Sequence, residues 1–308
     1  MTWISPNVFR QGPDQPLSSI PRFDPIAKNL RFRHIIHVYD DKELPENTAL
    51  QFVTFDTVND AVILCKSALD VACVAITYPD DAHLVPEHIT LGPPLTRYAC
   101  DIIDVSKRRP LPLLYDIIDL GLSAPLEKNA AEEFVILTNS DIHVQPNFYR
   151  FAAEIIGMGY DVATVNRRTI EVDQHDRRNR ALYSVDAGKP HPGFDCFIFP
   201  VSLYSRFVKT NSCCGAGLVM RSLLFNLVST CQRFLMVTGA HATYHLGDDR
   251  KWQVSEFAEY EESNAREAQR VLDHFGRSAI ASSNLRPFVA SHEAANFADY
   301  LDRVPIAS

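Results

Sequence analysis

Glycine is scarce in this sequence. The chain has 12 glycines among 308 residues, about 4% where about 7% is usual. A nucleotide site made from a glycine-rich loop is therefore not expected. Neither the GxxxxGK[ST] pattern of P-loop NTPases nor the GxSxG elbow of serine hydrolases occurs, which argues against both enzyme classes.

Long apolar runs are also missing, since none approaches the roughly 18–20 residues of a membrane span. The first residues show no basic stretch followed by an apolar one, so no signal peptide is expected. The seven cysteines form no CxxC pair, which argues against a zinc ribbon or a thioredoxin-type motif. We therefore expect a cytoplasmic protein with no membrane span.

Positive charge is in deficit. Thirty Lys and Arg against 38 Asp and Glu give a net charge of −8, whereas a nucleic-acid binder normally shows a basic stripe. No nucleic-acid partner is therefore expected. With 46% hydrophobic and 22% charged residues, the composition is that of an ordinary globular protein.

Apolar segments that favour strands and helices alternate along most of the chain. The helix that follows Pro146 is the best supported, because its apolar residues recur at the spacing of one buried helical face. Strands are expected at 51–55, 71–77, 133–138, 161–165 and 194–200, and a helix at 58–69. This alternation predicts an α/β fold with a mainly parallel sheet and helices on both faces.

The two ends of the chain have no such alternation. Residues 1–33 contain five prolines and no clear period, so they are expected to form an irregular arm. A single catalytic domain is expected over residues 34–276, followed by a C-terminal extension over residues 277–308.

The most informative motif is Asn139-Ser140-Asp141, between a predicted buried strand and the helix after Pro146. Ligands of open α/β sheets bind outside the carboxyl ends of the strands. A carboxylate at this place can hold a hard divalent cation, which can neutralise a diphosphate. The alternative is that the three residues only form the loop and cap the next helix.

This segment resembles the centre of the GT-A fold glycosyltransferases, a Rossmann-like superfamily with a mixed sheet. The resemblance rests on the segments 134–142, 148–149, 159–161 and 165–168, and it covers roughly residues 50–252. In that superfamily a DxD motif binds a metal and the diphosphate of a nucleotide sugar. Here Asn139 replaces the first Asp. The resemblance implies that Asp141 contacts Mn²⁺ or Mg²⁺ and that Asn139 contacts the donor.

A second motif runs from His191 to Pro200, where a Pro-Gly turn and one carboxylate precede an apolar strand. The resemblance implies that His191, Gly193 and Asp195 face the transferred sugar and the acceptor. Asp195 is the candidate base that would remove the proton of an acceptor hydroxyl. Alternatively, Asp195 only caps the turn.

A third motif contains His241 and His245. If the segment is a strand, these imidazoles lie about 13 Å apart, at ~3.3 Å per residue, and cannot share one ion. The resemblance implies that His245 completes the metal site, with Asp248 as an alternative ligand, base or substrate contact. The alternative is that His245 is a structural histidine.

The remaining donor contacts are expected at two places. The strand at 51–55 and its loop are expected to contact the nucleoside through Thr54, Phe55, Asp56 and Thr57. Arg167 follows another predicted strand, and its guanidinium fits phosphate oxygens.

The sequence thus predicts a glycosyltransferase that uses a divalent metal and a UDP- or GDP-sugar and acts on an unknown acceptor. Three alternatives remain open. One is a non-catalytic protein of the same fold that binds a nucleotide sugar or a protein partner, and another is a nucleotidyltransferase. The third is a metal-dependent hydrolase built from His241, His245 and the Asp248–Asp249 pair.

Overall fold

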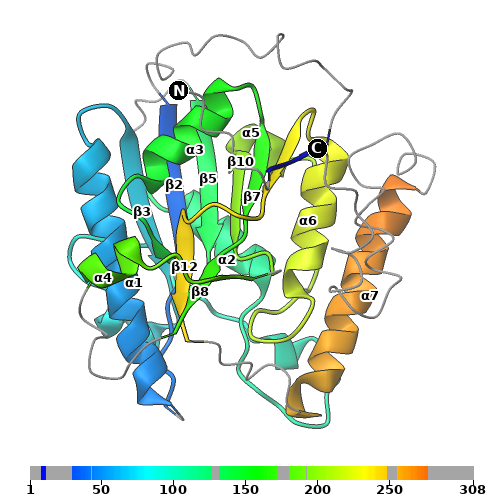
Figure 1. Ribbon diagram of the computed structural model, residues 1–308. Helices are drawn as coiled ribbons and strands as arrows, with labels where there is room; N and C mark the ends of the chain where they lie inside the picture. Colours follow the sequence, from blue (N-terminus) through cyan, green and yellow to red (C-terminus); the bar gives the residue numbers. More distant parts are fainter. Residues whose placement is uncertain are drawn as a thin grey trace.

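A central eight-stranded mixed sheet organises the protein, in the order β1-β11-β7-β10-β5-β2-β3-β4 (Figure 1). The computed structural model describes residues 8–11, 30–42, 44–126, 132–171, 180–191, 193–247 and 255–276. The strands are β1 (Val8–Gln11), β2 (Leu30–His37), β3 (Asp70–Ile76), β4 (Thr90–Leu91), β5 (Glu132–Thr138), β7 (Val162–Val165), β10 (Cys196–Pro200) and β11 (Phe234–Val237).

Most neighbouring strands of this sheet run parallel. β2 pairs in parallel with both β3 and β5, and the β3–β4 and β7–β11 pairs are also parallel. The strand β10 runs antiparallel between β5 and β7, and β1 runs antiparallel to β11. The mainly parallel mixed sheet predicted from the sequence is confirmed.

Helices cover both faces of the sheet, as expected. On one face, Phe32 and Ile36 of β2 pack with residues of α1 and α3; on the other, Ile35 packs with residues of α2, α6 and α7. The longer helices are α1 (Pro45–Cys65), α2 (Leu114–Ser123), α3 (Phe148–Gly157), α6 (Val219–Thr230) and α7 (Ala258–Phe275), and the short ones are α4 (Arg180–Val185) and α5 (Val201–Tyr204).

The predicted strand at 51–55 is wrong, because these residues lie inside α1. The local run of aromatic and β-branched residues favours a strand, but burial follows a helical period. The buried positions of α1 include Leu50, Thr54, Val58, Ala61 and Cys65, which recur every three or four residues. Packing of this face against the sheet outweighs the local preference.

The predicted irregular arm is also wrong in two places. β1 lies within residues 1–33 and pairs with β11, and β2 starts at Leu30 rather than after residue 33. The first residues of β2 include two buried arginines, and in the sequence these make the segment look polar. Arg31 pairs with Asp70, and Arg33 pairs with Glu133 at 2.5 Å. The predicted C-terminal extension, 277–308, lies outside the described residues.

A second, four-stranded sheet positions the candidate site. Its order is β6-β12-β8-β9, formed by β6 (His143–Val144), β12 (Thr243–Leu246), β8 (Arg168–Ile170) and β9 (Lys189–Pro190). Figure 1 shows β8 and β12 side by side, as their parallel pairing requires. Because β6 follows β5 after only the loop 139–142, this sheet begins at the carboxyl end of β5. Among the described residues, no helix is long and apolar enough to cross a membrane.

A row of buried, hydrogen-bonded side chains joins α3, β2 and β5 near the carboxyl end of β5. His34 is fully buried, with Nδ1 2.8 Å from the Tyr149 hydroxyl and Nε2 2.9 Å from the Thr138 hydroxyl. Burial lowers the pKa of His34 from 6.5 to about 3. His34 is therefore neutral in the folded protein across the whole physiological pH range.

The lowered pKa of His34 predicts how the free energy of unfolding changes with pH. Above pH 6.5 neither state protonates it, whereas below pH 6.5 the unfolded chain takes up a proton that the folded chain refuses until about pH 3. We expect His34 to remove about 1.4 kcal/mol of unfolding free energy per pH unit in that window. Urea unfolding at pH 7, 6 and 5 measures this slope, which His34→Gln should reduce. The exposed His83→Gln is the control and should leave it unchanged.

Candidate functional site

The first pair of site residues joins the loop after β5 to β12. His245 Nε2 lies 3.2 Å from Asp141 Oδ2, and His245 Nδ1 donates to the Gly247 carbonyl at 2.7 Å. The His245 side chain is 3% exposed and that of Asp141 33% exposed, so the carboxylate faces the open side. Two residues that are 104 positions apart in sequence are thus brought together.

The second group forms around Asp195, at the start of β10. Asp195 Oδ1 lies 3.6 Å from Arg167 Nη1, and Oδ2 lies 3.6 Å from His191 Nδ1. The Gly193 N–H donates to His191 Nδ1 at 3.0 Å. A Cβ atom at Gly193 would lie 2.7 Å from the His191 ring, so the ring packs closely on the glycine. The structure therefore brings His191, Gly193, Asp195 and Arg167 together.

Opposing charges hold both carboxylates in the ionised form. Burial by itself would raise the pKa of Asp141, but His245, Arg167 and His143 lower it well below 3.8. Burial likewise opposes ionisation of Asp195, but the Arg167 charge and the His191 contact lower its pKa below 3.8. Since Arg167 acts on both carboxylates, the two groups belong to one site.

His143 is not among the site residues predicted from the sequence, but the structure places it in this site. His143 is fully buried, its Nδ1 lies 2.8 Å from the Thr54 hydroxyl, and its Nε2 has no hydrogen-bond partner. Burial, followed by the His245 charge, lowers its pKa to about 3. The available signal was its position two residues after Asp141, which places it on the short strand β6.

Several buried polar atoms of this site have no partner among the described residues: Asp141 Oδ1, His143 Nε2, Arg167 Nε and Asp195 Oδ2. A buried polar atom without a partner costs about 1–3 kcal/mol. Folded proteins rarely leave such atoms unmatched, and functional sites are a common exception. Because four such atoms lie together in this site, we interpret it as a place where a polar ligand binds.

The predicted nucleoside contacts do not form one surface. Thr54 holds His143, Phe55 lies in the core, Asp56 pairs with Arg180 at 2.7 Å, and Thr57 donates to a backbone carbonyl inside α1. These contacts were predicted on the assumption that residues 51–55 form a strand. In the helix α1, successive side chains instead point to different surroundings. Asp248 and Asp249 lie outside the described residues.

The carboxyl ends of β2 and β3 lie at the same edge of the sheet as the carboxyl end of β5, where the site is. Tyr39, two residues after β2, is fixed by Gln51, which accepts from the Tyr39 N–H at 3.2 Å and donates to its carbonyl at 2.7 Å. The Tyr39 ring stacks on His37 at 5.7 Å and 11°. The ring is only partly buried, so it offers an aromatic surface at the carboxyl end of the sheet.

A divalent cation fits the Asp141–His245 pair. His245 donates through both nitrogens, and an ion would replace the Nε2 proton, as metal binding to histidine requires. The Gly247 carbonyl then fixes the ring in the usual way for a metal-ligating histidine, and Asp141 Oδ1 has no partner. Within the described residues, no group of three or more His, Cys, Asp or Glu is arranged as a metal site, so other ligands would be needed.

His241 does not join this pair. Its Nε2 accepts from the Gln145 amide at 2.6 Å, in the turn before β12. The predicted hydrolase site needs His241 beside His245, and the part of the chain described by the structure does not provide this arrangement.

No family model and no curated protein matches this chain. Among solved structures, it is similar to S. aureus TarS 1-349 in complex with UDP-GlcNAc, with 12% identity, a TM-score of 0.43, and coverage of 90% of this chain and 82% of the TarS 1-349 chain. It is also similar to a mycobacterial protein, at 11% identity, a TM-score of 0.43, and coverage of 78% and 73%. A third is galactosyltransferase LgtC with donor and acceptor sugar analogs, at 9% identity, a TM-score of 0.39, and coverage of 77% and 95%.

Proposed function

We propose that this protein is a metal-assisted glycosyltransferase that takes a sugar from a nucleoside-diphosphate donor. The observation that carries the proposal is the convergence of Asp141, His245, Arg167 and Asp195 at the carboxyl end of β5, with unpartnered polar atoms on three of them. These are the group types that a cation, a diphosphate and a sugar hydroxyl each require.

Asp141 and His245 would hold the divalent ion, which supplies charge neutralisation for a leaving diphosphate. Asn139 lies two residues before Asp141 in the same loop, and its side chain has no hydrogen bond among the described residues, so it is available to the donor. Arg167 adds a second positive charge, and its planar guanidinium suits phosphate oxygens. Mn²⁺ and Mg²⁺ both suit this oxygen-rich chemistry.

Asp195 would accept a hydrogen bond from a hydroxyl of the transferred sugar or the acceptor. Its Oδ2 is buried and unpartnered, and its carboxylate is held ionised by Arg167. An ionised carboxylate in this position is also able to take the acceptor proton as the new bond forms. His191 and Gly193 shape the turn that carries Asp195 and complete the sugar-facing wall.

The nucleoside would lie on the loop after β2, which replaces the region first predicted for it. The reasoning from the carboxyl ends of the strands is unchanged; only the strand differs, because the first parallel strand is β2. The Tyr39 ring would supply a stacking surface, and Gln51 fixes the Tyr39 backbone through two hydrogen bonds.

Removing the Tyr39 ring should weaken nucleotide binding. Base stacking on an aromatic side chain contributes about 1–3 kcal/mol, so Tyr39→Ala is expected to raise the dissociation constant of UDP or GDP at least fivefold. Isothermal titration in the presence of Mn²⁺ measures it. Tyr39→Phe keeps the ring and should bind nearly as the native protein does; equal losses in both variants would contradict stacking.

Incubation with a panel of UDP- and GDP-sugars and Mn²⁺ tests the proposed function. Release of the nucleoside diphosphate, by transfer to an added glycan or by slow hydrolysis, is the expected result. Release of pyrophosphate from a nucleoside triphosphate would instead indicate a nucleotidyltransferase. Nucleotide binding without turnover across the panel would favour the non-catalytic alternative, which the replacement of an acid by Asn139 keeps open.

A further inference from the structure

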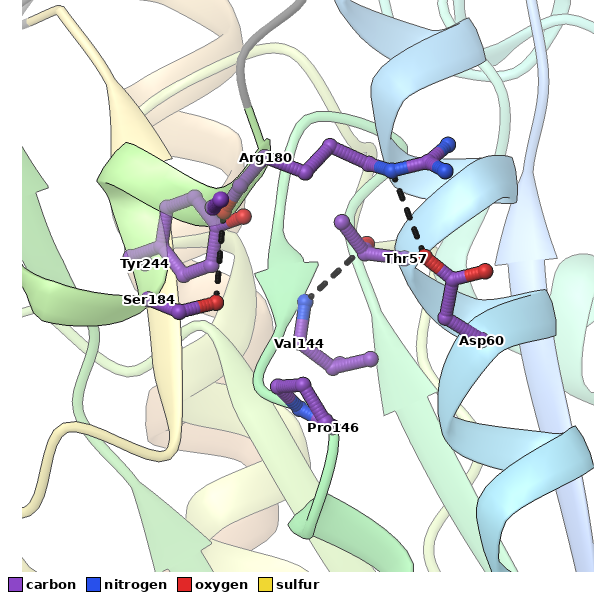
Figure 2. A pocket seen from close by; sticks show the side chains of 8 residues that line it. Thr57, Asp60, Val144, Pro146, Arg180, Ser184 and Tyr244 are labelled. Carbon is purple, nitrogen blue, oxygen red and sulfur yellow. Dashed lines mark hydrogen bonds and ion pairs between the residues drawn. The ribbon is translucent and has the colours of Figure 1, made fainter.

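A separate pocket of about 290 Å³ opens between α1, α4, β12 and the turn before α3 (Figure 2). Tyr244 of β12 lines it, whereas the next residue, His245, contacts Asp141. Successive side chains of a strand point to opposite faces, so the pocket and the candidate metal pair lie on opposite sides of β12. None of the roles proposed above uses this pocket.

The walls of the pocket differ in polarity. Val144, Pro146 and Ala181 supply apolar surface. Facing them, the Arg180 side chain extends toward α1, where its Nε lies 3.2 Å from Asp60 (Figure 2). Arg180 also pairs with Asp56 at 2.7 Å, so two carboxylates surround one guanidinium. The resulting negative balance disfavours phosphate and other anions as occupants.

Tyr244 brings a phenol to this pocket. The residue is 1% exposed, and its ring centroid lies 5.1 Å from that of His143 and 6.0 Å from that of Tyr183. The Ser184 and Thr57 hydroxyls are engaged, since Ser184 donates to the Arg180 carbonyl at 3.2 Å and Thr57 to the Thr54 carbonyl at 3.0 Å.

We propose that this pocket binds one ring of a neutral saccharide and serves as a remote subsite for a glycan acceptor. The acceptor role rests on the proposed glycosyl transfer, whereas saccharide binding does not depend on it. A sugar ring has an apolar C–H face for the apolar wall, and its hydroxyls match the carboxylate, the guanidinium and the phenol. The volume lies at the lower end of the ~300–1,000 Å³ of ligand pockets, which suits a single ring.

Titration of the full chain with neutral disaccharides (maltose, cellobiose, lactose and diacetylchitobiose), followed by saturation-transfer NMR, tests this proposal. At least one is expected to bind. Ala181→Trp should abolish binding by filling the pocket, and Val185→Trp is the matched control because Val185 lies on the same helix and is 80% exposed. Tyr244→Phe keeps the ring and should weaken binding about 3- to 10-fold, the contribution of one hydrogen bond.

Each outcome decides a different point. No binding by any disaccharide, or binding that Ala181→Trp leaves intact, overturns the saccharide site. If Ala181→Trp abolishes binding while Tyr244→Phe changes neither the affinity nor the thermal stability, the saccharide site stands and the contact assigned to the Tyr244 hydroxyl is rejected. If disaccharides bind in the pocket but no nucleotide sugar is bound or turned over, the saccharide site stands and the acceptor role is rejected.

Discussion

Asp141→Ala is expected to lower turnover of a nucleotide sugar at least about 100-fold. Asp141 supplies the partly exposed carboxylate of the pair with His245, and its buried Oδ1 is unpartnered. Without it, a cation has only the imidazole, and the charge that develops on the leaving diphosphate is left without its counterion. Interactions of this kind contribute several kcal/mol to the transition state, and ~1.4 kcal/mol corresponds to a tenfold change in rate.

The measurement is nucleoside-diphosphate release at saturating Mn²⁺, with Mn²⁺ binding followed by electron paramagnetic resonance. Asp141→Ala should lose both, and Asp141→Asn should lose most of both because an amide is a poor ligand for a hard cation. Asp273→Ala removes an exposed carboxylate on α7 and serves as the control. Full turnover by Asp141→Ala would reject the metal assignment.

Asp195→Asn is expected to reduce the rate of transfer by about 100- to 10,000-fold if the carboxylate takes the acceptor proton, the usual range for a general base. If Asp195 only binds a sugar hydroxyl, the loss should be about tenfold and fall mainly on KM. The fold is expected to tolerate this change, because asparagine has the same shape. Asp186→Asn, which alters an exposed carboxylate of the preceding loop, is the control.

The pH profile gives a second readout for Asp195. Arg167 and His191 lower its pKa below 3.8 against the opposing effect of burial, so it stays ionised as the pH falls from 8 to 5. Asp195 should therefore contribute no decrease in rate over that interval. A loss of activity near pH 6 that disappears in Asp195→Asn would contradict the lowered pKa.

Sequence reasoning succeeded where the local pattern and the tertiary surroundings agree. The residues Phe148, Ala152 and Ile155 form a buried face at helical spacing, and α3 buries that face against the sheet. The apolar run at 133–138 is β5, buried between β2 and β10. Since Asn139–Asp141 follows β5 directly, the place of this loop could be inferred from the sequence.

It failed where long-range packing overrides local preference. The segment 51–55 has the composition of a strand, but its neighbours in α1 extend the helical burial pattern over 21 residues. The start of β2 contains arginines that look exposed in sequence, and only Asp70 and Glu133 on adjacent strands make their burial tolerable. Neither partner is identifiable from positions 30–37 alone.

The sequence by itself determined the alternation of strands and helices and the position of Asp141 after a buried strand. Only the tertiary structure decided which groups meet: His245 with Asp141, Arg167 with Asp195, and His143 with Thr54. The physical reason is the separation in sequence between the residues that interact. Helical and strand periods arise from residues a few positions apart, whereas these contacts join different strands, helices and loops whose relative placement depends on the packing of the whole sheet.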